Sequence, residues 1–292
     1  MRALFGVAGN SITFTREVSK SSADAPAWLK SIGLDAYEYQ CGRGVHVKQP
    51  TAETIGQNAA AAGIVLSVHA PYFINLANPE RLEQNKKYVL DACRAARWMG
   101  ARRIVLHSGT LMKRTRAKAL EIAKHSLKEI VRCCDQAGFG DLTLCPETMG
   151  VVGQLGDLEE VLALCGLDER LTPCIDFGHL YARTAGALNG ADAMRHILDR
   201  MEQALGEERA AAFHSHFSHI EFTPERGEER HLSFADSQGF GPDFAPLGEE
   251  LARRGWGPTI ICESAGTQSE DALSMKECYG AFLKGQENIP QP

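Results

Sequence analysis

The feature that most constrains the fold is a regular alternation of short apolar segments with longer amphipathic ones. The amphipathic segments place apolar residues three and four positions apart, as in Arg116–Ala137, which predicts helices with one buried face. The short segments have the length of buried strands, and they are Ala3–Val7, Asp35–Tyr39, Ile64–Val68, Arg103–Leu106, Leu142–Cys145, Thr172–Ile175, Phe213–Ile220 and Pro258–Cys262. Eight strand–helix pairs predict a parallel sheet that closes into a (β/α)8 TIM barrel of the α/β class.

The length and composition are those of one large domain. The chain has 292 residues, of which 44% are hydrophobic, and we expect a single barrel over residues 1–285 with a flexible tail at 286–292. An open doubly wound sheet is the alternative, but no Gly-x-Gly-x-x-Gly follows the first strand, which disfavours its dinucleotide-binding form. The sequence has neither an apolar segment long enough for a membrane span nor a secretory signal. We therefore expect a cytoplasmic monomer.

Histidines and carboxylates recur where the predicted strands end. In a TIM barrel these ends meet at one rim, which is where such folds carry their chemistry. The third predicted strand, for example, is followed at once by His69. The rim residues predicted in this way are His69, His107, Glu147, Asp176, His179 and Glu263, with Glu229 and His231 in the loop after the seventh strand. The seventh strand carries His214, His216 and His219; alternation along a strand favours His216 as the rim residue, with His219 second.

This ring of side chains predicts a metal site. A salt-bridged rim is the alternative, but few arginines or lysines lie at these strand ends to pair with the acids. Nitrogen and carboxylate ligands in this mixture suit zinc, and also manganese or iron, and we expect two to three ions per chain. The net charge of −6 disfavours general nucleic-acid binding. Bound cations would add local positive charge that this count leaves out.

With these residues identified, the chain resembles the endonuclease IV family of apurinic/apyrimidinic endonucleases, within the xylose isomerase-like TIM barrel superfamily. The motifs that carry the resemblance are "SVHAPYFINLANPE", "VLHSGT", "PETMG", "CIDFGHLYAR" and "ICES", in the family's order. The resemblance implies hydrolysis of DNA 5′ to an abasic site, with Glu147 and Glu263 at the catalytic centre, during base-excision repair.

The resemblance also implies three zinc ions. His69, His107 and Glu147 would hold the first, and Glu147 would bridge to a second that is completed by Asp176, His216 and Glu263. His179, Glu229 and His231 would hold the third. The family typically has Asp-x-His in this last place, whereas this chain has Glu229-Arg230-His231. The third site is thus the one at which this sequence departs from the family pattern.

Three further residues are predicted to contact damaged double-stranded DNA. Tyr72 and Phe73 resemble the family's residues that enter the base stack where a base is missing, and unstacking is easiest at such a lesion. Arg43, after the second predicted strand, is expected to join them. The alternative role for Tyr72 and Phe73 is packing over the mouth of the barrel.

Two other functions remain open from the sequence. One is a metal-dependent sugar isomerase or epimerase on the same barrel, which would need Glu147 and Glu263 across one ion. The joint presence of His69, His107, His179 and His231 favours the nuclease. The other is a lesion-binding protein that keeps the barrel and its metals without turnover.

Overall fold

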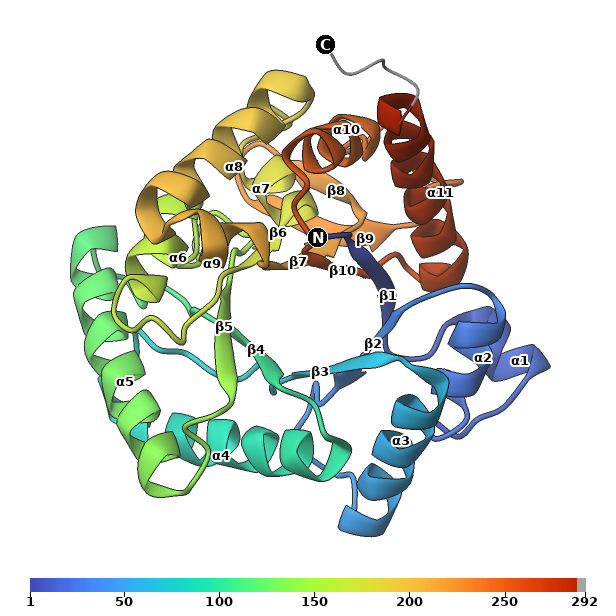
Figure 1. Ribbon diagram of the computed structural model, residues 1–292. Coiled ribbons are helices and arrows are strands. Elements are labelled where there is room, and N and C mark those ends of the chain that lie inside the picture. Colours follow the sequence, from blue (N-terminus) through green and yellow to red (C-terminus); the bar gives the residue numbers. More distant parts are fainter. Residues whose placement is uncertain (288–292) are drawn as a thin grey trace.

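The protein is a closed parallel barrel in a computed structural model that describes residues 1–287. Neighbouring strands follow the order β1-β10-β7-β6-β5-β4-β3-β2, and Figure 1 views the barrel along its axis. The barrel strands are β1 (Leu4–Ala8), β2 (Ala36–Gln40), β3 (Val65–His69), β4 (Arg103–His107), β5 (Thr143–Glu147), β6 (Cys174–Asp176), β7 (His214–Phe217) and β10 (Thr259–Cys262). The predicted TIM barrel is confirmed.

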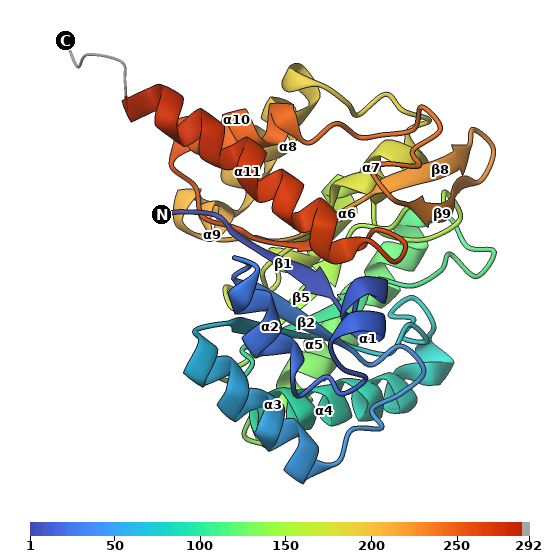
Figure 2. The same cartoon turned by 90° about the vertical axis from the view of Figure 1, so that its right-hand side faces the viewer.

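Helices surround this barrel and cover its outer face (Figures 1 and 2). They are α1 (Ile12–Glu17), α2 (Ala25–Ser31), α3 (Gln49–Ala62), the 3-10 turn η1 (Pro79–Arg81), α4 (Leu82–Met99), α5 (Arg116–Gln136), α6 (Leu158–Cys165), α7 (Phe177–Arg183), α8 (Ala191–Leu205), α9 (Glu207–Ala211), α10 (Ala245–Arg254) and α11 (Gln268–Glu287). None of the helices within residues 1–287 is long and apolar enough to span a membrane. Helix α11 passes the predicted domain end at 285, and residues 288–292 of the predicted tail lie outside the described residues.

The predicted seventh strand, Phe213–Ile220, is wrong in its second half. The barrel strand β7 ends at Phe217, and β8 (His219–Thr223) then leaves the barrel and pairs antiparallel with β9 (Gly227–Leu232). This hairpin lies beside the carboxyl ends of the barrel strands, at the end toward which the β1 arrow points in Figure 2. The segment predicted as a loop after the seventh strand therefore belongs to an ordered hairpin at the carboxyl end of the barrel.

The barrel has a different composition outside and inside. The layer between strands and helices is apolar; Phe5 of β1, for example, is fully buried against Phe244 and Tyr279, with ring centroids 5.9 and 5.7 Å away. The barrel interior instead holds buried polar side chains, among them Glu38 and His214. Strands buried on both sides normally carry apolar residues, so these polar groups need partners inside the barrel.

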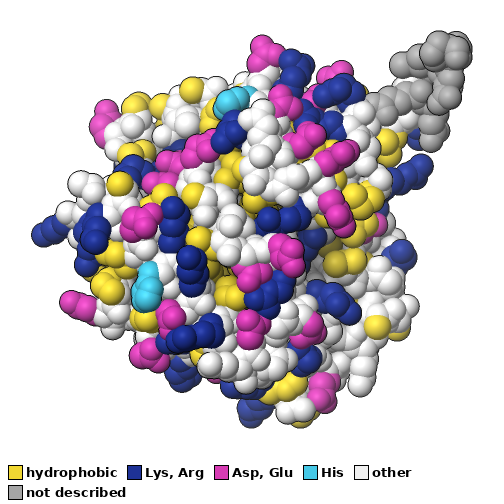
Figure 3. Space-filling model, turned by 60° about the vertical axis from the view of Figure 1, so that its left-hand side comes forward, with side chains coloured by type: hydrophobic (Ala, Val, Ile, Leu, Met, Phe, Trp, Pro, Cys, Tyr) yellow, Lys and Arg dark blue, Asp and Glu magenta, His cyan; other side chains and the backbone are white. Residues whose placement is uncertain are grey.

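The outer surface mixes charges of both signs. On the face shown in Figure 3, Lys and Arg side chains are interspersed with Asp and Glu. Ion pairs also join neighbouring elements at the surface, such as Arg170 with Asp135 at 2.5 Å. Exposed pairs of this kind contribute about 0–1 kcal/mol each, so they suit a solvated surface more than they stabilise the fold.

Candidate metal centre

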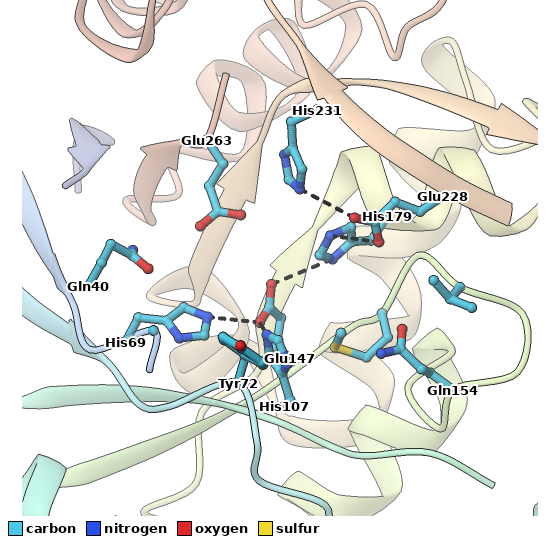
Figure 4. A pocket seen from close by; sticks show the side chains of 13 residues that line it. Gln40, His69, Tyr72, His107, Glu147, Gln154, His179, Glu228, His231 and Glu263 are labelled. Atoms are coloured by element: carbon cyan, nitrogen blue, oxygen red, sulfur yellow. Dashed lines mark hydrogen bonds and ion pairs between the residues drawn. The ribbon is translucent and has the colours of Figure 1, made fainter. Parts of the chain in front are cut away.

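A cavity of about 300 Å³ opens at the carboxyl end of the barrel. It is lined by side chains from many separate strands and loops, which point toward one another in Figure 4. Strand register explains this convergence, because parallel neighbours end at the same height: His107 pairs with Glu147, and Asp176 with His216. Side chains that are far apart in the sequence thus form one site.

The first cluster is made by His69, His107 and Glu147, whose ligand atoms lie within 4.8 Å of one another. The Nε2 atoms of His69 and His107 lie 3.3 and 3.4 Å from the same oxygen, Oε2 of Glu147. All three side chains come from the ends of barrel strands, and the Glu147 carboxylate is buried. Two imidazoles and a carboxylate aimed at one point form a suitable donor set for zinc.

A second cluster shares Glu147 with the first and adds Asp176, His216 and Glu263. The Nδ1 atom of His216 lies 3.0 Å from Oε1 of Glu147 and 3.5 Å from Oε2 of Glu263. The two oxygens of Glu147 therefore face different clusters. Glu147 is thus within reach of both clusters, as the bridging role predicted for it requires.

One atom of the second cluster accepts no hydrogen bond, although Nδ1 of His179 lies 3.4 Å from it. Asp176 is fully buried, and its Oδ2 atom is without a hydrogen bond, while Oδ1 accepts one from the backbone N–H of His179 at 2.7 Å. A buried carboxylate oxygen without a donor is unfavourable unless a cation faces it. The residues present thus fit a bound metal ion, and their nitrogen and oxygen atoms suit zinc, manganese or iron.

The third cluster consists of His179, Glu228 and His231. Asp176 caps the amino end of α7, and this cap places His179 in the first helical turn beside it. The Nε2 atoms of His179 and His231 lie 3.3 and 3.5 Å from the two oxygens of Glu228. His231 and Glu228 come from the hairpin strand β9, so this cluster joins the barrel to the hairpin.

The structure differs from the sequence expectation at Glu229, which lies outside the cluster. Its carboxylate accepts hydrogen bonds from Thr223 at 3.2 Å and Arg226 at 2.8 Å. The reason is a bulge in the hairpin: Glu221 pairs with Arg230, but the next residue, Phe222, pairs with Glu228. The extra residue breaks the two-residue alternation of the strand, so that Glu228 and His231 share a side. The acidic residue of the third cluster is therefore Glu228.

The second nitrogen of most ring ligands is also engaged. The Nδ1 atoms of His69 and His179 each lie 2.8 Å from a backbone carbonyl, that of Ala70 and that of Thr148. A carbonyl only accepts hydrogen bonds, so these Nδ1 atoms carry the hydrogen and each Nε2 atom is left facing its cluster. Outer partners of this kind fix the ring orientation and the tautomer of metal-binding histidines.

Two acids of the clusters, Glu147 and Glu228, are kept ionised by their neighbours, whereas burial raises the pKa of Asp176. Burial opposes ionisation of Glu147, but the charge and hydrogen bond of His216 outweigh it and hold the Glu147 pKa well below its usual value. Burial likewise opposes ionisation of Glu228, yet His179 and His231 lower its pKa to about 2. Burial itself lowers the pKa of His107 to about 4, which leaves that ring neutral. Carboxylates and a neutral imidazole are the forms that bind metals.

His219, the second candidate on the seventh strand, lies away from the clusters. It belongs to β8, and its ring stacks on Phe234 with a centroid distance of 4.4 Å. His216 is the histidine of this segment that the structure brings to the centre.

The three residues predicted to contact DNA differ in their surroundings. Tyr72 lines the cavity and is 49% exposed, and its backbone N–H donates to the carbonyl of Gly42. Phe73 is half-buried, because its ring packs against Tyr72 and Tyr88 at 4.4 and 5.8 Å. Arg43 is exposed in the loop after β2. Only Tyr72 of these three lines the cavity.

Four residues of the site are not among those predicted from the sequence: Glu38, Gln40, Gln154 and Glu228. Gln40 and Gln154 line the cavity, and Glu38 lies buried beneath it. The position of Glu38 in the middle of "AYEYQ" is a usable signal, because a charged residue inside a parallel barrel strand requires buried partners.

Comparison with known proteins adds the family. The profile described as xylose isomerase-like TIM barrel matches residues 26–278. The chain belongs to the xylose isomerase-like TIM barrel family. An uncharacterized protein of Methanocaldococcus jannaschii is 31% identical over 278 residues, which cover 94% of this chain and 96% of that relative. A probable endonuclease 4 of Mycoplasmopsis synoviae is 27% identical over 182 residues, or 61% of this chain and 60% of that protein.

Solved structures of xylose isomerase-like barrels are similar over nearly the whole chain. Endonuclease IV from Thermus thermophilus has a TM-score of 0.69 at 21% identity, with coverage of 97% of this chain and 99% of that one. A D-tagatose 3-epimerase-like protein also has a TM-score of 0.69, at 22% identity and the same coverage. At these identities the likeness shows the shared fold, which both a nuclease and an epimerase-like protein use.

Proposed function

We propose that this protein is a metal-dependent endonuclease that incises DNA 5′ to apurinic/apyrimidinic sites and leaves a 3′-hydroxyl. The observation that carries the proposal is the set of three contiguous clusters at one cavity, two of which share Glu147. A phosphodiester has several oxygens that must be held and neutralised together, and neighbouring cations are suited to that task. The probable endonuclease 4 relatives support the same assignment.

Each part of the site has a role in this proposal. When bound, divalent ions supply Lewis acidity toward a phosphate oxygen and an activated water. Glu147 and Glu263, which lie 3.0 and 3.5 Å from the same Nδ1 atom of His216, would hold the central ions. Asp176 would complete their set with the oxygen that accepts no hydrogen bond, and His179, Glu228 and His231 would bind the third ion. The exposed ring of Tyr72 at the cavity mouth is placed to stack where a base is missing.

Charge also favours a metal-loaded protein as the form that binds DNA. The chain alone has a net charge of −6, and the cavity is lined by the carboxylates of Glu147, Glu228 and Glu263. These groups would repel a phosphodiester in the metal-free protein. Ions at the clusters would reverse the local sign of charge, so we expect lesion binding to require metal.

A sugar epimerase is the second candidate. It is favoured by the similarity to the D-tagatose 3-epimerase-like structure and by the carboxylates of Glu147 and Glu263 in one cluster. That activity uses one ion between two carboxylates and gives no role to the third cluster. The cluster formed by His179, Glu228 and His231 is therefore the part of the site that separates the two proposals.

An incision assay tests the proposed function. Protein loaded with zinc or manganese is incubated with a duplex that carries one abasic analogue, and the same preparation is assayed for ketose epimerisation and ketose–aldose interconversion. We expect a single cut 5′ to the lesion with a 3′-hydroxyl end, and none with chelated protein or with an undamaged duplex. Tight lesion binding without a cut would identify a sensor. Sugar conversion without a cut would identify the epimerase.

A further inference from the structure

A carboxylate beneath the cavity, Glu38, belongs to none of the three clusters. It projects from the middle of β2 into the barrel and is completely buried. Its Oε1 atom accepts hydrogen bonds from Nε2 of His216 at 2.9 Å and from Gln40 at 3.2 Å. Its Oε2 atom accepts from Nε2 of His214 at 2.8 Å and from the Ser67 hydroxyl at 2.8 Å. Burying a charge costs free energy, and here four hydrogen bonds to the carboxylate offset that cost. This investment in one buried carboxylate indicates a specific role for Glu38.

The His216 ring lies between two carboxylates on opposite sides. Its Nδ1 atom faces Glu147, which lines the cavity, and its Nε2 atom faces Glu38, which is closed off from solvent. Of these two sides, the side of Nδ1 faces the cluster whose carboxylates Glu147 and Glu263 line the cavity. The Nδ1 atom is therefore the one available to an ion, and Nε2–H donates to Glu38.

We propose that Glu38 is a positioning residue that holds His216 in the Nε2–H tautomer, with the lone pair of Nδ1 directed at the metal cluster. The proposal rests on the metal binding of the proposed function, but not on the identity of the substrate. His214 and Ser67 fix the second oxygen of Glu38 and so prevent the carboxylate from turning away.

Glu38 is a charged hydrogen-bond partner, whereas the corresponding partners of three other ring ligands are neutral. His69 and His179 donate to neutral backbone carbonyls, and Nδ1 of His231 lies 2.8 Å from the Ser218 hydroxyl. A hydrogen bond to a carboxylate is stronger than one to a neutral acceptor, and it makes the opposite nitrogen a better electron donor. His216 is thus the ring ligand whose metal bond would be strengthened most by its surroundings.

The substitution Glu38→Gln tests this role, because it preserves shape and replaces one acceptor oxygen by an NH2 donor. Whichever way the amide lies, either His216 or His214 then loses its acceptor. If the NH2 group faces His216, the ring must accept at Nε2 and move its hydrogen to Nδ1, where the ion would bind. Glu250→Gln is the matched control, since Glu250 is also a buried carboxylate but pairs with Arg253 and Arg254 on α10.

The readout is metal retention against a competing chelator, together with the melting temperatures of metal-free and zinc-loaded protein. Loss of an outer partner typically weakens metal affinity about 10–100-fold, and we expect one ion of Glu38→Gln to weaken by that factor. Zinc should then raise the melting temperature of Glu38→Gln less than that of the wild type or Glu250→Gln. Unchanged retention, with both melting temperatures lowered equally, would show that Glu38 only supports the fold.

A measurement on the wild-type protein covers the case in which Glu38→Gln does not fold. Long-range proton–nitrogen NMR of histidine-labelled, zinc-loaded protein reports the tautomer of each ring, with His216 assigned by its loss in His216→Asn. We expect hydrogen on Nε2; hydrogen on Nδ1 would overturn the proposal. If the wild type holds zinc but cuts no abasic duplex, the proposed function fails and the role of Glu38 stands.

Discussion

The first and third clusters have similar ligands but different supports. His69, His107 and Glu147 all lie at the ends of neighbouring barrel strands. Glu228 and His231 instead lie on a two-stranded hairpin outside the barrel, and only His179 of that cluster follows a barrel strand. Ligands on the closed sheet are positioned by its hydrogen-bond ladder, whereas ligands on the hairpin depend on how firmly it docks. The comparison indicates that the third site is the more easily altered one.

The docking of the hairpin is visible in the backbone. The N–H of Glu228 donates to the carbonyl of Gly150 at 3.1 Å, and the N–H of Val152 donates to the carbonyl of Arg226 at 2.8 Å. A Cβ atom at Gly150 would lie 2.5 Å from Oε2 and 2.6 Å from Cβ of Glu228. The loop after β5 therefore holds the hairpin closely enough that only glycine fits at 150.

The largest effect is expected at the barrel-borne centre. Glu147→Gln removes the negative charge that two clusters share and places an NH2 donor among imidazoles. Loss of a residue that only supports a metal ligand lowers activity by up to about 100-fold. Because Glu147 is itself a ligand, we expect incision to fall by more than this, with weaker binding of two ions. Circular dichroism should show the fold retained, and near-normal incision by this variant would remove Glu147 from its bridging role.

A smaller effect is expected when the acid of the hairpin is changed. Glu228→Gln should weaken only the ion of the third cluster, by more than about tenfold, and leave the other two bound. Metal analysis after dialysis against graded chelator measures this difference.

Glu229→Gln is the matched control for Glu228→Gln, because it removes the same charge from the next residue. The Glu229 carboxylate bonds to Thr223 and Arg226, outside the cluster. We expect wild-type metal content for this variant. A loss at Glu229 with none at Glu228 would show that the bulge does not exist in solution and that the strand alternates regularly.

The docking itself can be probed at Gly150. Gly150→Ala should push Glu228 away from His179 at a cost of about 1–3 kcal/mol of local stability, as overpacking does. We expect faster hydrogen exchange in β8 and β9 and partial loss of the third ion. Gly153→Ala lies in the same loop with no atom within 4 Å of the added methyl group, and it should behave as wild type.

The smallest effect is expected at the cavity mouth, where no metal ligand is touched. Tyr72→Ala should weaken binding to an abasic duplex by about 1–3 kcal/mol, the value of one stacking contact, without a change in metal content. Tyr72→Phe keeps the ring and should bind nearly normally. Equal affinity of wild type and Tyr72→Ala would assign this residue to packing of the loop.

Much of this architecture follows from the sequence because buried parallel strands have distinct apolar runs. Their ends alone bring His69, His107, Glu147, Asp176 and Glu263 to one rim, as the structure has them. The hairpin did not follow from the sequence, since "HIEFTPERGEERHL" is mostly polar and its strands lie partly in solvent. The pattern therefore predicts a loop after Ile220.

Two details of the site depend on local geometry that residue patterns do not encode. The bulge that moves the third acid from Glu229 to Glu228 is a one-residue change in pairing between β8 and β9. Glu38 lies in the middle of its strand, whereas the site residues that the sequence predicts lie at strand ends or in the loops after them. Its partners His214 and His216 are 176 and 178 residues away in the sequence, and the closed barrel brings them next to Glu38.

The most direct test of the account measures metal content and incision on the same samples. Zinc-loaded protein is dialysed against increasing chelator, and each sample is assayed for ions per chain and for cutting of a duplex with one abasic analogue. We predict three ions in the active protein, loss of the hairpin-borne ion first, and a fall in incision that follows this first loss. Full incision with two ions per chain, or none with three ions bound, would contradict the account.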